Sequence, residues 1–219
     1  MRDCFFLVAD KTMEQIIAGF SGRDSFHRSL GCGHFDFDPE RDVKIAIGQN
    51  DPGLFLRAAE LLSPRLRQYR HAVVMLDAEW KGAPPADEQR KCVEADLRRG
   101  GWPETSIAAV IVEPEVDAWL WTGKIHTSRA LNWESYEELE RFLVERRMIE
   151  PGEQKPGRPK EAAELALREK GKPRSAAIYR QVAGHASIER NCNEPGLRYL
   201  VENMRRWFPP EIGSSGNAQ

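Results

Sequence analysis

Four short apolar segments most strongly constrain how this 219-residue chain can fold. They occupy residues 4–9, 43–47, 72–76 and 106–112. Between them lie segments whose apolar residues recur at helical spacing, at residues 12–20, 54–67 and 87–99. Short apolar runs bounded by turn residues are typical of strands buried on both faces. The alternation therefore predicts an α/β fold, an open and mainly parallel sheet with helices on both faces.

Beyond Pro114 the strand pattern ends, and five further helices are expected. They fall near residues 115–121, 136–147, 160–169, 175–183 and 196–207. Charge changes along the chain as well: residues 1–150 carry 20 basic and 26 acidic side chains, whereas residues 151–210 carry 12 and 7. We therefore expect an α/β core over 1–122, a helical extension with a basic segment over 123–210, and a disordered tail over 211–219.

Several functional classes are not expected from the composition. The net charge of −2 argues against a protein that binds nucleic acid through a basic tail. No apolar run approaches the roughly 20 residues of a membrane helix, and no signal-peptide pattern is visible. The four cysteines lack metal-ligand spacing, and no phosphate-binding or dinucleotide-binding glycine motif occurs. We expect a cytoplasmic protein with reduced thiols and no membrane partner.

Acidic residues follow three of the predicted strands. They are Asp10 and Glu14, Asp77 and Glu79, and then Glu113, Glu115 and Asp117. Ligands of open parallel sheets bind at the carboxyl ends of the strands. In extended backbone, residues i and i+2 face the same way, so Asp77 and Glu79 can converge on one hard cation. Asp10 or Glu14 would complete a magnesium site; the alternative is that these carboxylates are ordinary solvated groups and helix caps.

Two further groups of residues are candidates for this site. Glu115 follows Pro114 at a predicted helix start and is a candidate metal ligand, whereas Asp51 is expected to cap the helix over 54–67. Lys155, Arg158 and Lys160 are candidates for binding a nucleic-acid backbone. A cation at a helix start is unfavourable unless an anion lies nearby, either a phosphate or an acidic side chain of the α/β core. The alternative is an ordinary solvated basic surface.

The order of these motifs resembles the TOPRIM domain and, more narrowly, small TOPRIM-like proteins of bacterial defence such as those of the methylation-associated anti-phage system. The resemblance is carried by VADKTME (8–14), MLDAE (75–79), VEPEVDAW (112–119), KPGRPKEA (155–162) and RRWFP (205–209). Together these motifs span most of residues 4–209. The usual signature has Glu-Gly after the first strand, where this chain has Asp10-Lys11.

The resemblance implies Mg²⁺-dependent or Mn²⁺-dependent phosphodiester chemistry on DNA or RNA, in antiviral defence. Asp77 and Glu79 would hold the metal, and Asp10 or Glu14 would handle the proton. A second interpretation is a non-catalytic sensor or scaffold subunit that binds other defence proteins. The Asp10-Lys11 departure favours that second interpretation.

Overall fold

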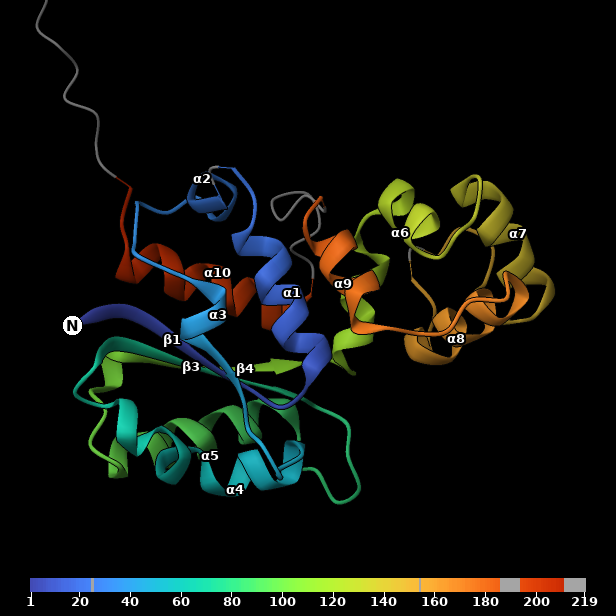
Figure 1. Cartoon of the computed structure of the whole chain (residues 1–219). Helices are drawn as coiled ribbons and strands as arrows, with labels where there is room; N and C mark the ends of the chain where they lie inside the picture. The colour runs from blue at the N-terminus through green and yellow to red at the C-terminus, as the bar shows by residue number, and fades with distance from the viewer. Residues whose placement is uncertain (25, 154, 186–193, 211–219) are drawn as a thin grey trace, which may run out of the picture.

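The computed structural model describes residues 1–24, 26–153, 155–185 and 194–210 (Figure 1). Within these ranges one sheet of four strands forms, in the order β2-β1-β3-β4, and all neighbouring strands are parallel. The strands are β1 (Arg2–Val8), β2 (Val43–Ile45), β3 (Tyr69–Asp77) and β4 (Ile107–Val112). The predicted α/β class with an open parallel sheet is confirmed.

The core of the sheet is built from the apolar runs. In the register of the central strands, Phe6 of β1 lies beside Val73 of β3, and Val74 lies beside Ala109 of β4. Val74 is fully buried, as are all six residues of β4. Because the strands are parallel, their carboxyl ends share one edge of the sheet, which brings the residues after β1, β3 and β4 to the same side of the molecule.

Helices cover both faces of the sheet (Figure 1). One face carries α1 (Lys11–Ser21) and α10 (Pro195–Trp207), and the opposite face carries α4 (Asp51–Leu62) and α5 (Ala86–Arg99). Helix α10 packs against β4, so residues 195–207 return to the sheet after the helical lobe. Its apolar residues Leu197, Leu200, Val201 and Met204 are buried at the i, i+3, i+4, i+7 spacing of one helix face.

A helical lobe follows β4. It consists of the 3₁₀ helix η3 (Val116–Thr122), α6 (Lys124–Ala130), α7 (Tyr136–Glu145), α8 (Pro159–Glu169) and α9 (Ala176–Ala183). The lobe joins the core where α9 packs on α1, and the approach is close at Gly19, where a Cβ atom would lie 2.4 Å from the Arg180 carbonyl oxygen. Within the described ranges, no helix combines the length and apolar composition that membrane crossing requires.

The structure differs from the sequence expectations at several short elements. Asn50 rather than Asp51 caps α4, since its side chain accepts a hydrogen bond from the Gly53 amide at 3.3 Å. The helix expected at 115–121 is a 3₁₀ helix. Periodicity missed α2 (Phe26–Leu30), α3 (Pro39–Asp42), α6 and the single turn η2 (Glu104–Ser106), because one or two turns carry too few apolar positions. The helix expected over 54–67 is α4 followed by the 3₁₀ turn η1 (Ser63–Arg65). The predicted disordered tail lies outside the described residues.

Candidate functional site

Asp77 occupies the end of β3, at the carboxyl edge of the sheet. Its side chain is half-buried, and Oδ1 accepts a hydrogen bond from the Val116 amide at 2.7 Å. Its own amide donates to Asp51 Oδ1 at 2.8 Å. Asp77 therefore links the start of α4 to the start of η3, two segments that flank the end of its strand.

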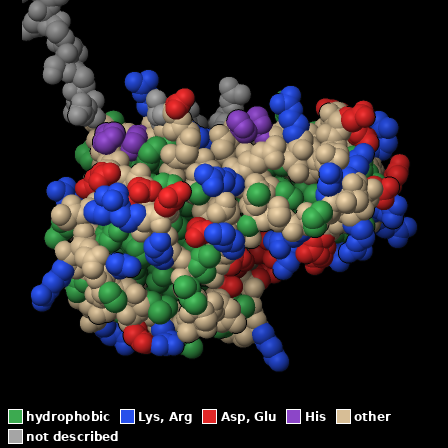
Figure 2. All heavy atoms as spheres, in the orientation of Figure 1, with side chains coloured by type: hydrophobic (Ala, Val, Ile, Leu, Met, Phe, Trp, Pro, Cys, Tyr) green, Lys and Arg blue, Asp and Glu red, His purple; other side chains and the backbone are tan. Residues whose placement is uncertain are grey.

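The electrostatic surroundings of Asp77 are strongly acidic. The pKa of Asp77 is raised to about 9, mainly by burial and then by the charges of Asp51, Asp10 and Glu115, against the opposing effect of the Val116 amide. Burial also raises the pKa of Asp51, with a contribution from Asp10. We call Asp10, Asp51, Asp77 and Glu115 the carboxylate cluster. Figure 2 shows acidic side chains gathered between the sheet and the helical lobe.

Asp51 is the member of this cluster that sequence reasoning assigned to another role. It was expected to cap α4, but Asn50 does so, and the Asp51 carboxylate instead accepts the Asp77 amide. A signal was available: Asp51 follows the short second strand, so it reaches the same edge of the sheet as Asp10 and Asp77. However, Asn-Asp-Pro after a short strand is also a typical helix N-terminus, so the pattern did not distinguish a capping Asp51 from a functional one.

The two acids after β1 have different surroundings. Asp10 is the N-cap of α1, and its Oδ1 accepts a hydrogen bond from the Met13 amide at 2.9 Å. Glu14, one turn further, forms an ion pair with Lys11 and accepts a hydrogen bond from Gln15. Asp10 raises the pKa of Asp77, whereas Glu14 is engaged within its own helix.

The backbone after Asp77 is not extended. The chain bends at Ala78, and the Glu79 amide donates to the Pro114 carbonyl oxygen at 3.1 Å. The extended backbone on which the expected convergence of the two carboxylates rested is therefore interrupted, and Asp77 is half-buried while Glu79 is exposed. Glu79 instead lines an adjacent open hollow.

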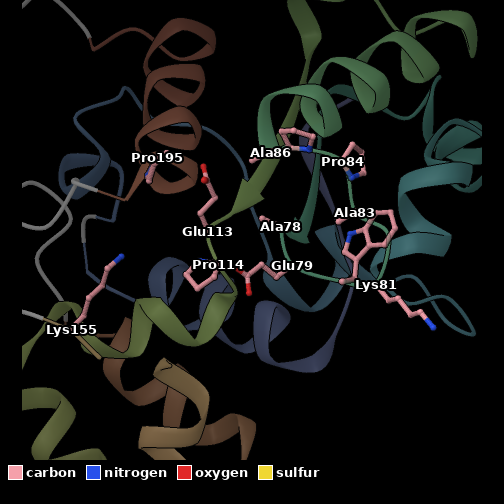
Figure 3. A pocket seen from close by; sticks show the side chains of 12 residues that line it. Ala78, Glu79, Lys81, Ala83, Pro84, Ala86, Glu113, Pro114, Lys155 and Pro195 are labelled. Atoms are coloured by element: carbon pink, nitrogen blue, oxygen red, sulfur yellow. The ribbon is translucent and has the colours of Figure 1, made fainter. Parts of the chain in front are cut away.

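This hollow has a volume of about 1060 Å³. It is formed by the loop between β3 and α5, by Glu113 and Pro114 after β4, by Lys155 from the segment before α8, and by Pro195 at the start of α10. Figure 3 shows Glu79, Glu113 and Pro114 between Lys155 on one side and Lys81 on the other. The charged side chains that line it are thus two carboxylates and two lysines.

The three predicted basic residues have separate positions. Lys155 lines the hollow, and Arg158 lies with a guanidinium nitrogen 3.9 Å from Met148 Sδ. The Lys160 amide at the start of α8 donates to Glu115 Oε1 at 3.3 Å. Burial, and then the charge of Asp117, raises the pKa of Glu115. Lys160 partly offsets this rise through its charge and its backbone amide. Glu115 of the α/β core is therefore an acidic side chain at the start of α8, one of the two kinds of anion expected there.

Glu194 was missed entirely by sequence reasoning. Its buried carboxylate accepts hydrogen bonds from the Glu113 amide, from Trp119 Nε1 at 2.8 Å and from the first amides of α10. It therefore fixes the segment after β4 that contributes both to the hollow and to the carboxylate cluster. Glu113 and Glu194 are 81 positions apart, and no local pattern predicts such a contact.

The donor set of the carboxylate cluster is chemically suited to a hard cation, because every candidate ligand is a carboxylate oxygen. The spacing is not preformed: among the residues that the structure describes, no three or more His, Cys, Asp or Glu side chains are grouped as metal ligands. Asp117, predicted in the same acidic run, is buried and bound by Arg174 at 2.7 Å and by the Tyr179 hydroxyl. Asp117 therefore holds η3 to α9.

No protein-family model matches the chain, and neither does any curated protein or any solved structure.

Proposed function

We propose that this protein is a TOPRIM-like, Mg²⁺-dependent or Mn²⁺-dependent nuclease that cleaves nucleic-acid phosphodiester bonds in bacterial antiviral defence. The observation that carries the proposal is Asp77, a half-buried carboxyl group at the carboxyl edge of the sheet whose pKa is raised first by burial and then by the charges of Asp51, Asp10 and Glu115. Burial and the charges of these three carboxylates destabilise the ionised form of Asp77, and a divalent cation would relieve this.

The residues fit such a cation by their chemistry. Asp77 would be the principal ligand, with Asp10, Asp51 or Glu115 beside it, and Glu79 would face the substrate from the hollow. A bound cation supplies charge that offsets the negative charge of the scissile phosphate. Of the two acid–base candidates, the surroundings favour Asp10, because Glu14 is paired with Lys11.

The experiment that tests the proposal is a cleavage assay. Supercoiled DNA, linear DNA and RNA are each incubated with the protein and Mg²⁺, with Mn²⁺ and with a chelator. We expect cation-dependent cleavage that Asp77→Asn abolishes. Asp36→Asn is the matched control, since this exposed carboxylate pairs with Arg2 at the other end of β1. Cleavage that survives in purified Asp77→Asn protein would contradict the assignment.

A second function, a non-catalytic sensor or scaffold subunit of a defence complex, is favoured by one observation. The same carboxylates accept backbone amides: Asp10 that of Met13, Asp77 that of Val116 and Glu115 that of Lys160. These bonds hold α1, η3 and α8 in place without any cation. In this interpretation the basic segment stabilises the contact of the lobe with the acidic core.

Charge reversal of Lys155, Arg158 and Lys160 to Glu separates the two functions. If the segment contacts nucleic acid, binding should weaken about equally for all sequences, and each lost phosphate contact should lower the salt slope by roughly 0.7–0.9. Mg²⁺ binding at Asp77 should remain. In the scaffold interpretation the triple variant loses thermal stability, and the unaltered protein shows no salt-sensitive nucleic-acid binding.

A further inference from the structure

The hollow beside the carboxylate cluster continues into a second one. The second hollow, of about 510 Å³, lies between α5 and α10 and shares Pro85, Ala86, Glu113 and Pro195 with the first. Together they form one groove that starts at Lys155 and ends beside Arg198 and Tyr199. A groove that is open along its length suits a chain-like ligand better than a compact one.

Three of the four cations that line this groove form no ion pair with the residues that the structure describes. Lys81 and Lys155 line it from opposite sides and are exposed (Figure 3). Arg198, exposed on α10, lines its far part. Within the described ranges, none of these three side chains forms an ion pair, whereas Arg90 in the same groove pairs with Asp87. Free cations spaced along a groove match the repeating phosphates of a nucleic-acid backbone.

An aromatic ring that lines the first hollow directly precedes Lys81 in the sequence. Trp80 lines the first hollow, is half-buried, and packs against Phe55 with ring centroids 5.6 Å apart. Prolines and alanines form much of the remaining wall. A tryptophan face beside cations is the combination that single-stranded nucleic acid uses, because only unpaired bases can stack on a side chain.

The acids of the groove set a condition for this ligand. Glu79 and Glu113 lie among the lysines, and Glu202 lines the far part beside Arg198, while Asp87 there is paired with Arg90. These carboxylates repel phosphates in the absence of a counter-charge. A divalent cation at these carboxylates or at the adjacent cluster removes this repulsion. Occupation of the groove by a polyanion therefore requires a divalent cation.

We propose that the groove binds one single strand of nucleic acid in the presence of a divalent cation, with Lys81 and Lys155 contacting phosphates and Trp80 stacking on a base. The inference rests on the proposed function and names its substrate class. It is separable from that function, because binding in the groove does not require cleavage.

The test measures binding of a labelled oligonucleotide of about 12 nucleotides, single-stranded or as a duplex, by fluorescence anisotropy with Ca²⁺, with Mg²⁺ and with chelator. Ca²⁺ takes the same oxygen ligands as Mg²⁺. Salt is varied between about 50 and 200 mM. The variants are Lys81→Ala, Lys155→Ala and Trp80→Leu. Lys44→Ala is the matched control, an exposed lysine on β2 at the opposite edge of the sheet from β4.

We expect cation-dependent binding that favours the single strand. Each lysine variant should lower the log–log salt slope by about 0.7, and Trp80→Leu should weaken binding about five-fold or more, while Lys44→Ala changes neither. Equal binding by all variants, tighter binding of the duplex, or no oligonucleotide binding at about 50 mM salt would each overturn the inference. If no oligonucleotide binds even at about 50 mM salt, the groove would instead be expected to bind a protein.

The cleavage assay distinguishes failure of the nuclease proposal from failure of the groove-binding inference. Lysine-dependent binding of the single strand without cleavage under any cation refutes the nuclease proposal and keeps this inference. Cleavage of single strands with an unchanged KM in the Lys81→Ala, Lys155→Ala double variant refutes this inference and keeps the nuclease proposal.

Discussion

Replacement of Asp77 by Asn should stabilise the protein without a cation, and the gain should grow with pH. Native Asp77 has a pKa of about 9, whereas a carboxyl group in the unfolded chain titrates near pH 4. Between these values the native state binds the extra proton, so the free energy of unfolding falls as pH rises. The fall is at most about 1.4 kcal/mol per pH unit.

Asn removes this dependence while preserving the local structure. Its side-chain oxygen can accept the Val116 amide as Asp77 Oδ1 does at 2.7 Å, and it carries no charge. Between pH 5 and pH 7 the wild type should lose up to about 2.7 kcal/mol relative to Asp77→Asn. Solvent screening reduces this upper bound, because the side chain is partly exposed. For a domain of this size the bound corresponds to a difference in Tm of roughly 5–11 °C.

The assay is thermal unfolding followed by circular dichroism at pH 5, 6 and 7 in the presence of a chelator. Asp36→Asn is the control and should follow the wild type at every pH, because that carboxylate is exposed. Parallel pH profiles for the wild type and Asp77→Asn would refute the argument that burial and neighbouring carboxylates raise this pKa.

A second measurement adds the cation. A ligand that binds only the folded state stabilises it by about 2.7 kcal/mol at a concentration of 100 times its Kd. Mg²⁺ should therefore raise the Tm of the wild type at pH 7 and leave that of Asp77→Asn unchanged. An equal rise in both proteins would show that Asp77 is not a ligand.

Three further substitutions test the fold. Val74→Asp should prevent soluble expression, because it places an unpaired charge in a fully buried central strand, and normal solubility and Tm would contradict the sheet assignment. Glu194→Ala should lower the free energy of unfolding by about 2–4 kcal/mol in urea titrations, since the amides of α10 and Trp119 Nε1 lose their acceptor; a change below about 0.5 kcal/mol would reject its structural role. Arg174→Ala should cost about 3–5 kcal/mol in the same titrations, because Asp117 remains buried without its cation, and an unchanged midpoint would disprove that dependence.

The sequence by itself determined the parallel α/β architecture. Apolar runs such as residues 72–76 are local, and burial of a strand on both faces requires little more than such a run. The run was extended by the structure to Tyr69–Asp77 but not displaced. The order of strands and helices then restricted the topology, because crossovers between parallel strands are almost always right-handed. The positions of Asp10 and Asp77 after their strands followed from the same reasoning.

The tertiary structure alone decided which charged groups meet. Asp51 lies 26 positions from Asp77, Glu115 lies 45 from Lys160, and Glu194 lies 81 from Glu113. Such contacts depend on how the loops bend and how the helices pack, and periodicity carries no information about either. The bend at Ala78 is the clearest case: Glu79, which follows it, lines the hollow that Lys155 also lines, while Asp77 remains half-buried. Local patterns predict where a strand ends, and packing determines what its last side chain touches.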